Sequence, residues 1–114
     1  MKYSIQEIAK ILNVKQQAFQ DTPSISILLT DSRLISTPEE SLFFALVTPN
    51  NDGHKFVKDL YEQGVRNFVV SKTMPEWTKL KDANFIKVAD TLVALQRIAA
   101  QHRKKFDIPV IGIT

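Results

Sequence analysis

Residues 42–47, Leu-Phe-Phe-Ala-Leu-Val, constrain the fold of this chain more than any other stretch. A short, continuous apolar run is typical of a strand that is buried on both of its faces. Such strands occur in parallel sheets that carry helices on each side. The run therefore predicts a layered α/β fold in which residues 42–47 form an inner strand.

The segments that follow complete a strand–helix–strand unit. Apolar residues at 56, 57, 60 and 61 have helical spacing, and Gly64 stands where a helix C-cap glycine belongs. Residues 67–71 then predict the next strand. A unit of this kind implies parallel pairing with a right-handed crossover. The predicted fold class is thus α/β, with a mostly parallel sheet and flanking helices.

The pattern extends in both directions along the chain. Towards the N-terminus, Ser4 and Glu7 match a capping box that starts a short helix, and residues 25–29 predict a strand. Towards the C-terminus, residues 85–88 predict a strand and residues 110–113 another. Between these two strands we expect a helix capped by Asp90 or Thr91, and before them a loop over 72–82 in which Trp77 covers the edge of the core.

Composition excludes several classes of function. The chain has 114 residues, 44% of them hydrophobic, which suits one domain with a real core. The net charge is only +3, and the basic cluster at 102–105 stands where a helix should end and complements its dipole. We therefore expect no nucleic-acid binding. No apolar run reaches the roughly 18 residues of a membrane span and the start has no signal core, so we expect a cytoplasmic protein with no membrane span.

Polar residues gather after two of the predicted strands. Thr30, Asp31, Ser32 and Arg33 follow the first strand, and residues 49–54, Pro-Asn-Asn-Asp-Gly-His, follow the second. Loops at the strand ends of an α/β sheet are where such folds usually bind their ligands. The stretch has no nucleophile–base pair and no metal cluster, so we predict no catalytic residue and no metal site.

Structural roles are open alternatives for each of these residues. Asp31 and Ser32 can satisfy turn amides, and Asp52 with Gly53 can simply reverse the chain. Arg33 can pair with an aspartate to brace the two loops. His54 can cap the following helix or pack at its start, and His102 is expected to be a half-buried spacer.

An ordered set of motifs resembles the N-terminal domain of the Mur ligases, the ATP-dependent enzymes that add amino acids to the peptidoglycan precursor. The set comprises Asp-Ser-Arg at 31–33, Leu-Phe-Phe-Ala at 42–45, Asp-Gly-His-Lys-Phe at 52–56, Gly64, and Val-Ile-Gly-Ile-Thr at 110–114. The chain is most similar to the MurF type, which adds D-alanyl-D-alanine. Its sequence also resembles the Mur ligases of Bacteroidetes, in which an alanine racemase is often fused to the ligase. It departs from the family at 40–41 and 48–49, where glycines are common.

The resemblance implies a binding role for the polar loops. In this family the N-terminal domain holds the UDP portion of UDP-N-acetylmuramoyl-peptide. The candidate binding residues are Thr30, Ser32, Pro49, Asn50 and Asn51, with Arg33 and His54 in a second tier. Asparagine amides present both a donor and an acceptor, as the uracil edge requires.

The resemblance also implies that catalysis takes place elsewhere. Family members use ATP and Mg²⁺ on a central domain, but this sequence has no Gly-x-x-x-x-Gly-Lys-Ser/Thr motif. We therefore expect residues 1–108 to form the UDP-sugar-binding domain and residues 109–114 to begin the central domain of a longer ligase. The fragment alone should need no cofactor and be inactive, and its partners should be the substrate and the other domains of its own chain.

Three alternative hypotheses about the function of this chain remain open. The chain can be a Mur ligase domain from a member that adds a single amino acid. It can be a stand-alone α/β module whose polar loops contact a protein partner. It can also be a small enzyme that acts on a phosphorylated metabolite.

Overall fold

The structure is a computed structural model that describes residues 3–14, 19, 24–30 and 37–106, with side chains as far as residue 101. Within these residues the helices are α1 (Ile5–Ile11), α2 (Val57–Glu62) and α3 (Thr91–Phe106), with short 3-10 helices η1 (Pro38–Glu40), η2 (Gly53–Phe56) and η3 (Pro75–Lys79). The strands are β1 (Ile27–Leu29), β2 (Ser41–Phe44), β3 (Val47–Thr48), β4 (Asn51–Asp52), β5 (Asn67–Val70) and β6 (Asn84–Lys87).

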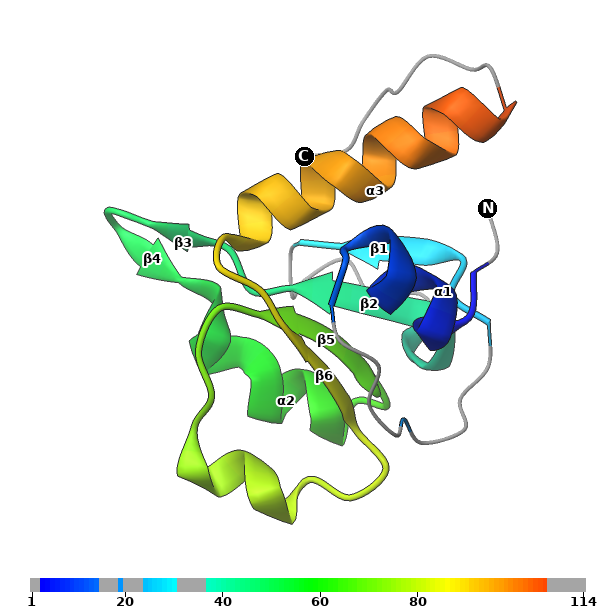
Figure 1. Ribbon diagram of the computed structural model, residues 1–114. Helices are drawn as coiled ribbons and strands as arrows, with labels where there is room; N and C mark the ends of the chain where they lie inside the picture. Colours follow the sequence, from blue (N-terminus) through cyan, green and yellow to red (C-terminus); the bar gives the residue numbers. More distant parts are fainter. Residues whose placement is uncertain (1–2, 15–18, 20–23, 31–36, 107–114) are drawn as a thin grey trace.

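Four strands form a parallel sheet in the order β1-β2-β5-β6. Each strand therefore lies beside the one that precedes it in the main sheet, and all carboxyl ends meet at one edge. The remaining strands, β3 and β4, form an antiparallel hairpin that projects from the carboxyl end of β2 (Figure 1). The predicted α/β class with a parallel sheet is confirmed.

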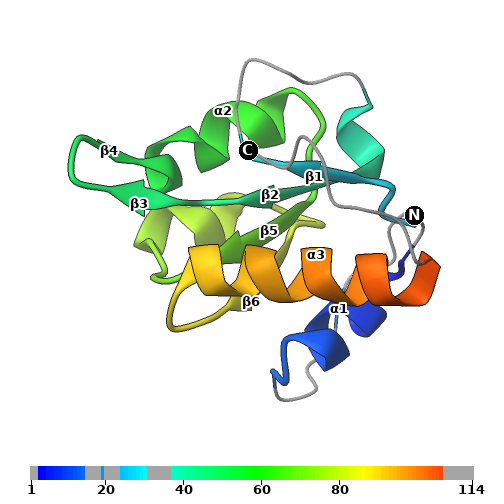
Figure 2. The same ribbon diagram turned by 90° about the horizontal axis from the view of Figure 1, so that it is seen from above.

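Helices cover both faces of the sheet, as Figure 2 shows from above. Leu42 and Phe44 of β2 point into a core shared with α1 and α3. Phe43 and Ala45 point the other way, into a core shared with α2 and Trp77. Residues 42–45 thus alternate between two different cores, which explains why all four are apolar.

The local signals for helix ends are confirmed. The Ser4 hydroxyl accepts from Glu7 N at 3.1 Å, and Glu7 Oε1 accepts from Ser4 N at 2.9 Å, which completes the capping box of α1. Gly64 follows α2 with φ of +112°, a conformation that side chains disfavour. Asp90 is the cap of α3, because its Oδ1 accepts from the backbone N–H groups of Leu92 and Val93.

The predicted strand at 42–47 was wrong at its C-terminal end, because β2 stops at Phe44. Leu46 N donates to Phe44 O at 2.9 Å, a three-residue turn that directs the chain out of the sheet. Val47 then lies in the hairpin with 58% of its surface exposed. The strand predicted at 110–113 lies outside the described residues.

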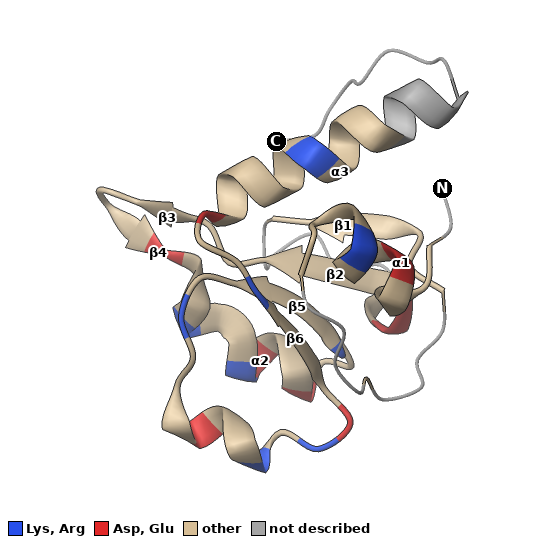
Figure 3. Ribbon diagram, in the orientation of Figure 1, with Lys and Arg blue, Asp and Glu red and all other residues tan. Residues whose placement is uncertain are grey.

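The first predicted strand and the position expected for Trp77 are found with small shifts. Ile25 precedes β1 and forms an isolated bridge with Tyr3, so the regular strand is shorter than predicted. Trp77 is buried against Phe85 of edge strand β6, with ring centroids 4.9 Å apart. In the view of Figure 3, positively and negatively charged residues stand together on α1, on α2 and in the loop between β5 and β6. No helix among the described residues has the length and apolarity to cross a membrane.

Candidate functional site: the carboxyl edge of the sheet

The β3–β4 hairpin carries three of the predicted binding residues. Thr48 pairs with Asn51 in the ladder, so Pro49 and Asn50 form the two-residue turn at the tip. Pro49, Asn50 and Asn51 are all exposed. The hairpin therefore presents two carboxamide side chains and a proline ring to solvent.

The sequence of the tip dictates its geometry. Proline fixes φ of Pro49 near −65°, which excludes the mirror-image turns usual in two-residue hairpins. Asn50 is not among the described residues with positive φ, so the turn is not of type II either. A type I turn matches the twist of the flanking strands poorly, which is consistent with a ladder of only two residue pairs.

Thr30 lies at the carboxyl end of β1, the strand next to β2. It directly follows β1, and the register pairs Leu29 with Phe43 near the end of β2. Thr30 and the base of the hairpin are therefore on neighbouring strands at the same edge. Ser32 and Arg33, the other predicted residues of this loop, lie outside the described residues, as does Asp31.

Asp52, at the base of the hairpin, is the centre of a hydrogen-bond network. Its Oδ2 accepts from Lys72 Nζ at 2.6 Å, and its Oδ1 accepts from His54 N at 2.9 Å. The same Oδ1 lies 2.6 Å from His54 Nδ1. The Lys72 ammonium, with further help from the His54 N–H groups, holds the pKa of Asp52 well below its usual range.

His54 connects this network to the sheet. Its Nε2 accepts from Ser71 N at 3.0 Å, just past the end of β5. A backbone N–H can only donate, so Nε2 carries no proton and Nδ1–H donates to Asp52. The side chain is 2% exposed, and its ring lies parallel to Trp77 with centroids 6.0 Å apart. Both ring nitrogens are thus engaged within the protein, which favours the structural alternative for His54.

Gly53 allows the hairpin to approach the sheet closely. Its N–H donates to Leu46 O at 2.7 Å. A Cβ at this position would lie only 2.9 Å from Leu46 N and 3.1 Å from Ala45 Cα. Besides the chain reversal considered from the sequence, Gly53 thus has a second role: the absence of a side chain lets two backbone segments touch.

Sequence patterns missed Lys72 and Ser71 as parts of this edge. Ser71 lies 17 residues after its partner His54, and Lys72 lies 20 residues after its partner Asp52, so no short sequence pattern contains both members of a pair. A signal was nevertheless present, because Ser71 ends the predicted strand at 67–71, Lys72 follows it, and parallel strands end at the same edge of the sheet.

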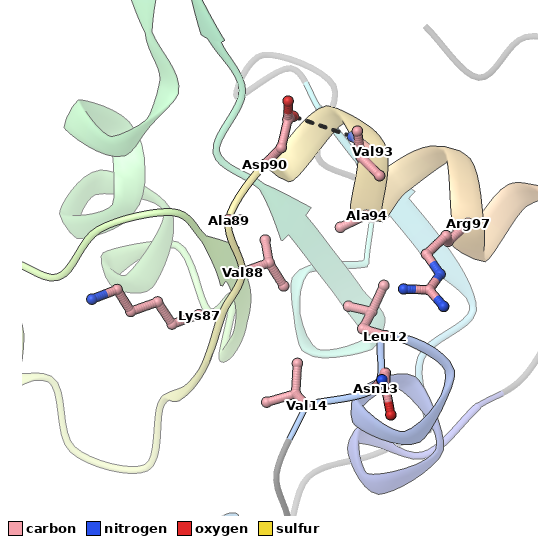
Figure 4. A pocket seen from close by; sticks show the side chains of 10 residues that line it. All are labelled: Leu12, Asn13, Val14, Lys87, Val88, Ala89, Asp90, Val93, Ala94 and Arg97. Atoms are coloured by element: carbon pink, nitrogen blue, oxygen red, sulfur yellow. Dashed lines mark hydrogen bonds between the residues drawn. The ribbon is translucent and has the colours of Figure 1, made fainter.

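A groove of about 470 Å³ lies between the end of α1, the end of β6 and the start of α3, and none of the predicted binding residues lines it (Figure 4). In Figure 4 the Arg97 guanidinium points towards Leu12 and Asn13, whereas Lys87 points away from them. This groove is therefore separate from the candidate site.

The described residues contain no group of three or more His, Asp or Glu side chains that can hold a metal ion. The full sequence has no phosphate-loop motif. What the edge of the sheet offers is hydroxyl, carboxamide and backbone groups, a set suited to binding an uncharged polar ligand portion through hydrogen bonds.

The fold and this edge define the class of protein: a parallel α/β domain with exposed polar loops at the carboxyl ends of its strands. No family model matches the chain. It is 38% identical over 90 residues to the UDP-N-acetylmuramoyl-tripeptide–D-alanyl-D-alanine ligase of Synechocystis, a match that covers 79% of this chain and 19% of the relative. It is 34% identical over 86 residues to the UDP-N-acetylmuramoyl-L-alanyl-D-glutamate–2,6-diaminopimelate ligase of Clostridium tetani, with 74% and 17% covered.

A solved structure shows the same fold. The crystal structure of MurF from Acinetobacter baumannii superposes with a TM-score of 0.70 at 22% identity, covering 92% of this chain and 22% of that one. The chain corresponds to the N-terminal domain of a Mur ligase, and it is most like the MurF type. It spans about a fifth of the length of the curated relatives that it matches.

Proposed function

We propose that this chain is the substrate-binding N-terminal domain of an ATP-dependent ligase that adds D-alanyl-D-alanine to UDP-N-acetylmuramoyl-tripeptide in peptidoglycan synthesis. The observation that carries the proposal is the 38% identity to a ligase of this name over 90 residues. The structure supports it through position, since Thr30 and the hairpin tip occupy the edge where parallel α/β sheets bind ligands.

In this proposal the domain binds the UDP portion of the substrate. Asn50 and Asn51 offer donors and acceptors to the uracil edge, and the ring of Pro49 offers an apolar surface. Thr30 and Ser32 supply hydroxyl and main-chain groups, with Arg33 as a further candidate. His54 contributes indirectly, because its ring nitrogens are already bonded to Asp52 and Ser71.

Anchoring the nucleotide orients the distant peptide carboxylate that reacts. Binding energy from a remote part of a substrate holds its reactive end in place, which replaces a bimolecular encounter by a positioned one. ATP and Mg²⁺ supply activation of that carboxylate, and the proposal assigns both to other domains of a longer cytoplasmic protein. Residues 109–114 would begin the first of these domains, and the 114-residue chain alone would be inactive.

An NMR titration tests the binding role. We expect UDP-N-acetylmuramoyl-tripeptide, UDP and uridine to shift the backbone amides of residues 30–33 and 47–54. Asn50→Ala should weaken binding roughly 2- to 10-fold, the loss of one or two hydrogen bonds. Gln63→Ala is the matched control, because Gln63 is an exposed carboxamide at the far end of α2. Silence of the wild-type domain at millimolar ligand would contradict the proposal.

A second candidate is the diaminopimelate-adding reaction, which the 34% identity to the Clostridium tetani relative favours. Phosphate release by the full-length ligase separates the two. The proposal requires release with the tripeptide precursor and D-alanyl-D-alanine. Release only with the dipeptide precursor and diaminopimelate would replace it by the second candidate.

A further inference from the structure

The β3–β4 hairpin has little support of its own. Its ladder has two residue pairs, and its side chains from Val47 to Asn51 are exposed. An isolated two-stranded hairpin is marginally stable in water, even when it is longer than this one. The direction in which the tip points must therefore be set at the base, where the chain leaves and re-enters the sheet.

At the base, one carboxylate and one imidazole connect the hairpin to a different strand. Asp52, the last residue of β4, receives Lys72 Nζ and two N–H groups of His54. His54 in turn receives the N–H of Ser71. Both Lys72 and Ser71 follow β5, the strand next to β2, so the network spans two neighbouring strand ends.

Aromatic stacking also fixes the position of the His54 ring in this network. The buried imidazole stacks on Trp77, which itself stacks on Phe85 with an interplanar angle of 4°. A buried ring with both nitrogens bonded has one orientation available to it. Asp52, fixed by that ring, then has its own orientation determined.

We propose that Asp52 and His54 are positioning residues, which hold the hairpin tip in its binding conformation without contacting the ligand. The inference rests on the proposed function for the identity of the ligand. It goes further by separating two roles within the segment 49–54. Residues 49–51 contact the ligand, whereas residues 52 and 54 fix where those contacts lie.

Preorganisation of this kind changes affinity through the population of the competent conformation. If that fraction falls to about one tenth, the apparent dissociation constant rises about tenfold although no ligand contact is removed. Lys72 has a smaller share, since its side chain is 51% exposed and the ammonium supplies one of the three donors to Asp52.

The test combines ligand-free dynamics with affinity. The variants are Asp52→Asn, whose single amide oxygen cannot accept from Lys72 and from both His54 N–H groups at once, then Lys72→Met and the conservative Lys72→Arg. Lys58→Met is the matched control, because Lys58 is an exposed lysine on α2. Backbone ¹⁵N relaxation gives order parameters for residues 48 and 51, titration with UDP-N-acetylmuramoyl-tripeptide gives the dissociation constant, and a thermal melt verifies that each variant is folded at the temperature used.

Asp52→Asn should lower the hairpin order parameters from about 0.85 towards 0.6 and raise the dissociation constant about tenfold. Lys72→Met should raise it about threefold, while Lys72→Arg and Lys58→Met stay within about twofold. Rigid hairpin amides in folded Asp52→Asn would overturn the inference, with or without ligand. A wild-type domain that binds no ligand would refute the proposed function instead, and the relaxation data would still decide the role of Asp52.

Discussion

Replacing Gly53 by alanine should push the base of the hairpin away from the end of β2. The added Cβ would lie 2.9 Å from Leu46 N, 3.0 Å from Leu46 O and 3.1 Å from Ala45 Cα. All three are backbone atoms, so no side chain can rotate out of the way. The two segments must separate by about 0.5 Å to reach a normal carbon contact distance.

The cost of this change follows from what the separation disrupts. Gly53 N donates to Leu46 O at 2.7 Å, and this hydrogen bond lengthens as the segments part. Overpacking by one methyl group typically lowers the free energy of unfolding by about 1–3 kcal/mol. For a domain of this size the melting temperature should fall by roughly 5–15 °C.

Gly64→Ala provides a control of similar energy at a different place. Gly64 has φ of +112°, and an added Cβ would lie 3.2 Å from Cβ of Pro38. A left-handed backbone costs an L-residue about 1–2 kcal/mol, so this variant should also be destabilised. Its effect should stay near the end of α2, far from the hairpin.

Urea unfolding and ¹H–¹⁵N spectra distinguish the two variants. Gly53→Ala should shift the amides of residues 46–52 and weaken UDP binding, whereas Gly64→Ala should shift those near residues 37–40 and leave binding unchanged. Unmoved hairpin amides together with an unfolding free energy within about 0.5 kcal/mol of wild type would refute the close-packing argument.

Three further predictions concern the cap, the aromatic stack and pH. Asp90→Ala removes the acceptor for two N–H groups of α3 and should lower the free energy of unfolding by about 1 kcal/mol in urea titrations, with Gln96→Ala as an unaffected exposed control. Trp77→Ala should cost about 3–5 kcal/mol, since the ring is buried against Phe85; a loss below 1 kcal/mol by circular dichroism would contradict this packing. The pKa of Asp52 is lowered on folding, so its stabilisation is complete above the ordinary aspartate pKa of about 3.9 and is lost progressively as the pH falls below it. The stability difference between wild type and Asp52→Asn should therefore shrink between about pH 5 and pH 2, and a difference that grows on acidification would contradict the assignment.

Features that depend on a few neighbouring residues were predictable from the sequence. The capping box of α1 needs only Ser4 and Glu7, and the end of α2 needs only a glycine at 64. The parallel class followed from the apolar run, because burial on both faces leaves a continuous pattern. The rule that carboxyl ends share an edge then placed Thr30 and the residues after β2 together.

Features that depend on distant contacts were not predictable. The strand at 42–47 was expected to run through Val47, but the turn at Leu46 is stabilised by Gly53, seven positions later. The pairing of Asp52 with Lys72 depends on β5 lying next to β2, which local patterns do not reveal. His54 was ambiguous for the same reason, since its partners come from two other segments.

The two cores of the sheet differ in the lengths of chain that build them. The core that contains Trp77 draws its buried residues from a continuous segment between Leu29 and Trp77. The core on the other face joins Tyr3 and α1 to Leu95 and Ile98 of α3, at opposite ends of the described chain. With strands added in sequence order, the first core can assemble while the chain is still being synthesised, whereas the second must wait for α3. Loss of α3 should thus leave a half-covered sheet whose exposed apolar face favours aggregation. Helix α3, at the end of the described chain, therefore completes the core against which α1 packs.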